Sequence, residues 1–212
     1  MRKIFREEQG EFGIGSLIIF IAMIIVSAVT AVVLIQVTYQ LQQQAESTGE
    51  TAIQDVSMGV KIISIGGYRY NSTWGTGAPY HNTLDWIDIK ITLIPGSPAI
   101  SVSSIIIEVS DGNNSVDLVY DESMSFDGGA NPQGSSGKFG ASVIRDMSPQ
   151  TLNEGTITTG DVVRLFFNAT ACGLSLEPQS YFTLKIIPKH GVPTIKEITT
   201  PSPYVSRYVE VV

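Results

Sequence analysis

The sequence predicts an α+β protein in which one long, hydrophobic N-terminal α-helix is followed by an antiparallel, immunoglobulin-like β-sandwich. Three observations predict it. Residues 13–35 form an apolar run without a charged residue. All ten prolines lie between Pro79 and Pro203, so the first third of the chain has none. After Gly67 the chain alternates short apolar segments with turns rich in glycine, proline and serine, which is typical of strands.

Residues 1–10 are expected to be a leader that is removed. They carry three basic and two acidic residues, and the positive-inside tendency keeps such an end in the cytoplasm. A secretory signal has an apolar region of about 7–15 residues, closed by a small-x-small cleavage site. The run here is longer and has no such site. We therefore place the cut in front of it, between Gly10 and Glu11, which leaves the apolar run on the mature chain.

Residues 11–63 are expected to form the helix. Its apolar part, residues 13–35, is about 35 Å long at 1.5 Å per residue, enough to cross a hydrocarbon core of about 30 Å. A helix that is apolar on every side has to be buried on every side, in lipid or against other helices. Ser27 and Ala31 form a small-xxx-small pair that lets helix backbones approach closely. From Gln36 onward the apolar positions narrow to a stripe.

Residues 64–212 are expected to form the sandwich. In segment 85–94, apolar residues at 87, 89, 91 and 93 alternate with polar residues at 88, 90 and 92, which indicates a strand with one buried face. About seven or eight strands separated by turns favour a sandwich. The further expected strands are segments 101–110, 115–121, 161–168, 180–188 and 207–212.

Composition limits the function. The net charge of −7 argues against nucleic-acid binding, which needs a basic face. The single cysteine, Cys172, excludes an intrachain disulfide, and its apolar setting predicts a buried, inert thiol. The two histidines, His81 and His190, are far apart, and the chain has no metalloprotease, phosphate-binding or nucleophile motif. We therefore expect no enzymatic activity and no cofactor.

One acidic segment is a weak candidate for a cation site. Asp111, Asn113, Asp117 and Asp121 place oxygen atoms at spacings that suit Ca²⁺, although they do not match the EF-hand pattern. Acidic turns of this kind are common without any metal, so the expectation for the chain as a whole is no metal site.

Three sequons, at Asn71, Asn113 and Asn168, are candidates for N-glycosylation. We expect all three on the outer face of the sandwich. Asn71 lies among aromatic residues, Tyr68, Tyr70, Trp74 and Tyr80. That cluster is either a loop folded onto its own sandwich or a subunit contact surface.

Two segments resemble the archaeal flagellins, or archaellins. The first is QGEFGIGSLIIFIAMIIVSAV, which is similar to the class III signal sequence and helix start of that family. The second is LKIIPKHGVPTIKEITTPSPYV, which is similar to its closing segment. Bacterial type IV pilins usually have a glutamate at the fifth mature position, where this chain has Gly15, and this favours an archaellin.

The resemblance implies a subunit of the archaeal flagellum, a rotating extracellular filament for swimming. The subunit is held briefly in the cytoplasmic membrane and then polymerises through its helix. Implied partners are further copies of the chain, sister archaellins, a prepilin-type peptidase, a membrane assembly platform with its ATPase, and an oligosaccharyltransferase. The implied filament-core residues are Phe12, Gly13, Ile14, Gly15, Leu17, Phe20, Ala22, Ser27, Ala28, Ala31 and Leu34.

Two other functions remain open from the sequence. An archaeal type IV adhesion pilin uses the same processing and a similar helix, but the PTIKEITTP segment argues against it. A single-pass, membrane-anchored surface binding protein with a β-sandwich is the other, and an uncut leader would favour it.

Overall fold

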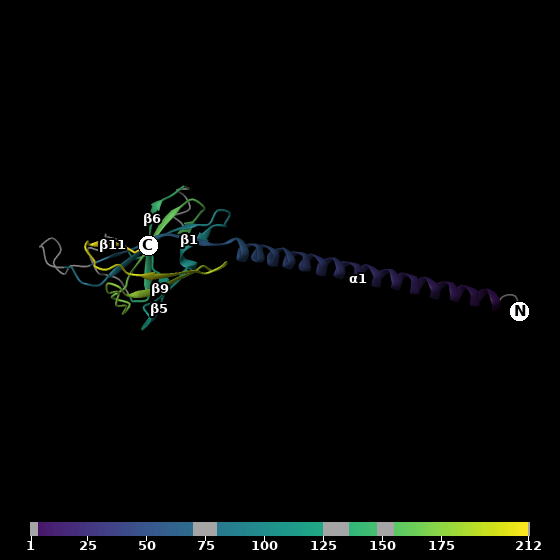
Figure 1. Cartoon of the computed structure of the whole chain (residues 1–212). Helices are drawn as coiled ribbons and strands as arrows, with labels where there is room; N and C mark the ends of the chain where they lie inside the picture. Colours follow the sequence, from purple (N-terminus) through teal and green to yellow (C-terminus); the bar gives the residue numbers. More distant parts are fainter. Residues whose placement is uncertain (1–3, 70–79, 125–135, 148–154, 212) are drawn as a thin grey trace. The chain divides into compact units, whose positions relative to one another are not determined.

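The computed structural model describes residues 4–69, 80–124, 136–147 and 155–211, without the side chains of residues 4–12. The chain forms two compact units, Met1–Ala52 and Ile53–Val212. Helix α1 spans Ile4–Ser57 (Figure 1). It begins within the expected leader and ends before Ile63, the end that we expected. Residues 60–63 belong instead to strand β1, because Val60, Lys61 and Ile62 pair with Leu93, Thr92 and Ile91.

The second unit is a β domain, as the sequence predicts. Its strands form a nine-stranded sheet in the order β10-β9-β4-β5-β6-β8-β2-β1-β11, and β3 and β7 form a second, two-stranded sheet. Neighbours are antiparallel except β5 and β6, which are parallel. The bounds are β1 Val60–Tyr68, β2 Trp86–Leu93, β3 Ile100–Ser101, β4 Ile106–Ser110, β5 Ser115–Tyr120, β6 Lys138–Arg145, β7 Thr156–Ile157, β8 Val162–Asn168, β9 Tyr181–Ile187, β10 Thr194–Thr199 and β11 Tyr208–Glu210, with a 3-10 turn at Val102–Ser104.

The large sheet curls around one core, which gives a sandwich-like domain. Ile87, Ile89 and Ile91 are fully buried, so the alternation predicted for β2 is confirmed. They belong to one core with residues of the neighbouring strand β8 and of β4 and β9, which lie farther along the sheet. Where the curl brings β10 towards β1, the hydroxyl of Thr194 donates a hydrogen bond of 2.6 Å to the carbonyl of Val60.

The opposite face of β2 is also covered, which the sequence did not indicate. Asp88, expected on a polar outer face, is only 2% exposed, and Trp86 and Phe166 are buried beside it. The Trp86 and Phe166 rings are 6.1 Å apart between centroids. A Cβ at Gly140 would overlap the Phe166 ring, so glycine is needed there for the close packing of β6 on β8.

Candidate assembly surface and its connection to the β domain

The apolar segment of α1, residues 13–35, presents its side chains outward on every side. Ile14, Phe20 and Leu34 are 63%, 62% and 61% exposed. The segment lies in the part of α1 that is long and apolar enough to cross a membrane. Burying one large apolar side chain is worth about 1.5–3 kcal/mol. The segment therefore needs an apolar environment that the described residues of its own chain do not supply.

The few hydroxyl groups near this segment are satisfied within the helix. Ser27 donates to the carbonyl of Met23 at 2.8 Å, and Thr30 donates to that of Val26 at 2.8 Å. Such bonds to a preceding carbonyl leave no unpaired polar group on the helix surface. The segment is thus compatible both with lipid and with the interior of a helix bundle.

Every predicted contact residue from Gly13 to Leu34 lies exposed on α1. Gly10, Glu11 and Phe12 are helical, and their side chains are outside the described part of the structure. An added Cβ at Gly13 or Gly15 has no neighbour within 4 Å. Small residues at these positions would let a second helix backbone approach closely.

The C-terminal end of α1 is capped by a side chain from the β domain. The hydroxyl of Ser97 accepts a hydrogen bond from the N–H of Gly59 at 3.1 Å and donates one to the carbonyl of Ser57 at 3.0 Å. The N–H of Ile94 donates to the carbonyl of Gly59 at 3.0 Å. The last carbonyls of a helix have no hydrogen-bond donor within the helix. Here the loop after β2 supplies donors at this end of α1.

The turn between β9 and β10 contacts the same helix end. Nδ1 of His190 lies 2.9 Å from Oδ1 of Asp55, in the last turn of α1. Gly191 has a φ of 92°, in the region that favours glycine. A Cβ there would overlap the carbonyl of Met58. Two loops of the β domain thus contact residues 55–59 at this end of the helix.

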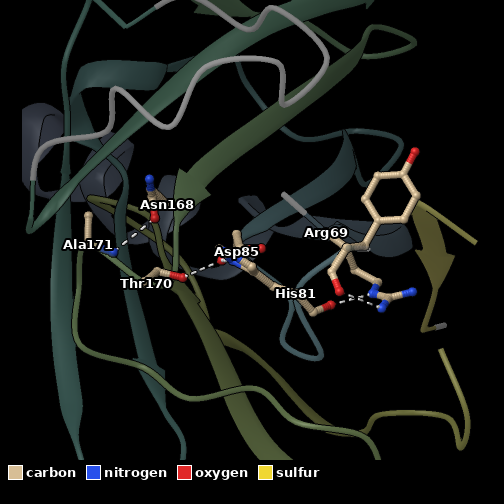
Figure 2. Close-up of polar contacts among 7 residues, drawn as sticks. Arg69, His81, Asp85, Asn168, Thr170 and Ala171 are labelled. Atoms are coloured by element: carbon tan, nitrogen blue, oxygen red, sulfur yellow. Dashed lines mark hydrogen bonds and ion pairs between the residues drawn. The ribbon is translucent and has the colours of Figure 1, made fainter. Parts of the chain in front are cut away.

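A buried arginine just after β1 bonds the carbonyl of His81 (Figure 2) and also a carbonyl of the C-terminal segment. Arg69 is 9% exposed, and it donates hydrogen bonds to the carbonyls of His81 at 2.7 Å, Tyr204 at 3.0 Å and Tyr80 at 3.3 Å. Its guanidinium carbon lies 5.6 Å and 5.8 Å from the ring centroids of Tyr80 and Tyr204, within reach of cation–π attraction. Tyr80 therefore packs on its own domain. Tyr70 and Trp74 lie outside the described residues.

The sequon at Asn168 is buried, so its expected position on the outer face is wrong. Asn168 is 2% exposed, and its Oδ1 accepts a hydrogen bond of 2.9 Å from the N–H of Ala171 (Figure 2). Next to it, Oδ1 of the buried Asp85 accepts from Thr170 at 3.0 Å and lies 3.2 Å from Nδ1 of His81. The side-chain amide of Asn168 closes the turn after β8 through its hydrogen bond to the backbone of Ala171, and it does not face solvent.

Asn113 is exposed in the turn between β4 and β5, as expected. That turn is ordered by Asp111, whose Oδ1 accepts from the N–H groups of Asn113 at 2.9 Å and Asn114 at 2.6 Å. Burial acts to raise the pKa of Asp111, but these bonds and one from Ser175 outweigh it, so the pKa is lowered. The third sequon, at Asn71, falls outside the described residues.

The three aspartates of the weak cation candidate do not come together. Among the described residues no group of three acidic, histidine or cysteine side chains is placed to hold a metal. Asp111 caps its own turn, and Asp121 pairs with Lys138 at 2.7 Å. The bonds from Lys138 and Ser123 lower the pKa of Asp121 to about 2. Asp111 and Asp121 therefore each stabilise a separate turn, and Asp117 lies on β5 between the two turns.

Cys172 is buried, as predicted, at 7% exposure. Burial raises the pKa of its thiol, which keeps the group protonated and unreactive.

Comparison with known protein families identifies the family of the chain. The model of the archaeal-type flagellin family matches residues 10–198. The chain belongs to this family. It is 34% identical to Flagellin B2 of Methanocaldococcus jannaschii over 215 aligned residues, which cover 96% of this chain and 94% of the relative. It is 32% identical to Flagellin B4 of Pyrococcus abyssi, with 92% and 95% covered. Flagellins of this family are structural subunits, so the chain is not an enzyme.

Solved archaellin structures share the fold. One is the crystal structure of archaeal flagellin FlaB1 from Methanocaldococcus jannaschii, with a TM-score of 0.60, 24% identity, and 73% of this chain and 96% of that one covered. The other is the archaeal flagellum of Methanospirillum hungatei, with a TM-score of 0.64, 15% identity, and 94% and 98% covered. With 94% of this chain covered, the second structure includes most of the helix as well as the β domain.

Sequence analysis missed the residues that hold the end of α1. Gly191 and Thr194 lie within the closing segment quoted for the family resemblance, so that segment carried a signal. Ser97 carried none, because a serine in a proline-rich loop is ordinary. Arg69 also gave no signal in the sequence. Its partners are backbone carbonyls, and only the fold brings them to the arginine.

Proposed function

We propose that this archaellin polymerises through the apolar segment of α1 to form the filament of the archaeal flagellum, which rotates outside the cell for swimming. The observation that carries the proposal is the full exposure of the apolar segment, residues 13–35. A filament made of many copies supplies the apolar surroundings on every side. The related structures, a flagellin and a flagellum, support the same function.

Processing and export precede assembly in this proposal. A prepilin-type peptidase cuts between Gly10 and Glu11, and the apolar segment holds the subunit in the cytoplasmic membrane until it is assembled. A membrane platform with its ATPase then moves the subunit from lipid into the filament, next to further copies or sister archaellins. The subunit passes through water-exposed states on this path, which cost free energy, so an energy source is required.

An oligosaccharyltransferase modifies the outer domain in this scheme. Asn113 is the best supported acceptor because it is exposed in a turn. Asn71 remains a candidate on its sequon alone. Asn168 is dropped because its side chain is buried. Glycans on an acidic outer domain add to its solubility and leave the apolar helix free for assembly.

Filaments sheared from the native cells test the proposal. Electron microscopy should show filaments, and N-terminal sequencing of their subunit should begin Glu-Phe-Gly-Ile-Gly. Deletion of the gene should remove either the filaments or one subunit band from them, together with swimming. Subunits that begin at Met1, or a deletion strain with unchanged filaments and motility, would contradict the proposal.

A further inference from the structure

A groove lies on the β domain beside the start of β1 and β10. It has a volume of about 710 Å³. Ile62, Ile94, Pro95 and Pro193 contribute apolar walls, and Ile94 is 45% exposed. An exposed apolar groove bounded by polar residues is typical of an interaction site.

Two lysines stand at this groove without a counter-ion. Lys61 on β1 and Lys196 on β10 both line it and are both exposed. Neither forms an ion pair with any residue in the described part of the chain. By contrast, Lys138 and Lys185 on other strands pair with acidic residues at 2.7 Å and 3.0 Å. The groove therefore offers an apolar floor with two free positive charges, which fits an acidic, partly apolar partner.

The polar half of α1 has the complementary features. It carries three acidic residues, Glu46, Glu50 and Asp55, and no lysine or arginine, since no basic residue occurs between Arg6 and Lys61. Asp55 pairs with His190 of its own chain at 2.9 Å. Glu46, Glu50 and Ile53 share one face of the helix, because they follow a spacing of four and three residues. Ile53 is 69% exposed, and Val56 nearby is 85% exposed. One helix face thus combines unpaired carboxylates with exposed apolar side chains.

We infer that the groove of one subunit binds residues 46–56 of α1 in a second copy of the chain. Ile53 and Val56 enter the apolar part, and Glu46 and Glu50 face Lys61 and Lys196. The apolar contact supplies the affinity, while the charges set the register and reject a misplaced neighbour. This contact rests on the proposed polymerisation, and it adds an interface outside the apolar segment.

Disulfide trapping in filaments tests this contact directly. The only native cysteine is buried, so any disulfide between subunits must form between the introduced cysteines. Lys196→Cys combined with Glu50→Cys should give disulfide-linked dimers and longer multimers on a non-reducing gel after mild oxidation of filaments. The matched control replaces Lys196→Cys with Ser115→Cys, an exposed position on β5 away from the groove, and should remain monomeric. Filaments that form no dimer with a cysteine at position 46, 50 or 53 overturn the inference, as does an equal signal from the control.

A charge-reversal experiment tests the same contact independently, also where the cysteine variants do not assemble. Lys61→Glu with Lys196→Glu should lower the filament yield about tenfold or more, because four like charges then meet. Adding Glu46→Lys and Glu50→Lys should restore it. Normal assembly of the first variant, or failure of the second to restore it, overturns the inference. Loss of filaments from the unchanged chain would instead refute the proposed function, so the two failures are distinguishable.

Discussion

Ala31→Asp is expected to abolish filaments while leaving the β domain folded. Ala31 lies in the apolar segment, and the chain has no charged residue between Glu11 and Glu46. Removal of residues 1–10 takes Arg6 with it, so the nearest positive charge on the processed helix is the new amino group of Glu11, 20 residues away, or about 30 Å at 1.5 Å per residue. A neighbouring copy displaced along the axis by less than that distance brings no cation to the new carboxylate.

The cost follows from this lack of a counter-ion. A carboxyl buried without a partner becomes neutral instead of staying charged. Protonating an ordinary aspartate, with a pKa near 3.9, at pH 7 costs about 4 kcal/mol. That value lowers the association of each subunit about 1,000-fold. Insertion into the membrane costs only about 2.5–3.5 kcal/mol on translocon scales, so the variant should be inserted and processed but not assembled.

The assay is electron microscopy of the cell surface together with an immunoblot for processed subunit. Ala31→Ser is the matched control, because Ser27 shows that a serine here can bond the carbonyl four residues earlier. The serine variant should keep its filaments, and the aspartate variant should show processed subunit without filaments or swimming. Normal filaments from the aspartate variant would refute the burial of this face in the assembly.

Three further results are expected. Arg69→Met should destabilise a fragment of residues 53–212 by about 3 kcal/mol in thermal unfolding, because hydrogen bonds to a charged group are worth about 1.5–3 kcal/mol; a loss below about 1 kcal/mol contradicts this. Burial raises the pKa of the Asp88 carboxyl above its ordinary value of 3.8. The stability that the protonated carboxyl contributes is therefore complete below pH 3.8 and is lost as the pH rises through the raised pKa. Asp88→Asn should flatten this decline in denaturation curves, and an unchanged pH profile refutes it. Asn113→Gln should remove one glycan from the intact mass, whereas Asn168→Gln should remove none; the reverse pattern would refute the assignment.

The helix and the strand pattern could be predicted because they depend on local spacing. Residues 13–35 carry no charge and only three hydroxyl side chains, which favours a helix for a segment of that length in lipid or a bundle. In β2 the period of two placed Ile87, Ile89 and Ile91 on the buried face, and all three are fully buried. Local patterns of this kind need no knowledge of distant partners.

Other features could not be predicted because they depend on distant segments. Asp88 is buried because Trp86, Phe166 and the neighbouring strands cover the second face of β2, and no periodicity records that cover. The parallel pairing of β5 with β6 is equally non-local. The end of α1 was misplaced because Val60 and Ile63 fit the 3–4 spacing of a helix stripe, and only the pairing of Val60 and Ile62 with β2 shows that this segment is a strand.

Lipid and a helix bundle are nearly equivalent surroundings for the apolar segment. Both are apolar, and the hydroxyls of Ser27 and Thr30 are already bonded within the helix. Transfer from the membrane into a filament therefore gains little from the hydrophobic effect, and close packing of small residues has to favour it. That contribution alone gives little control over the register of neighbouring subunits, since an all-round apolar surface is similar at many offsets. Contacts outside the segment, between Lys61 or Lys196 of one copy and Glu46 or Glu50 of another, provide the discrimination that the apolar surface lacks.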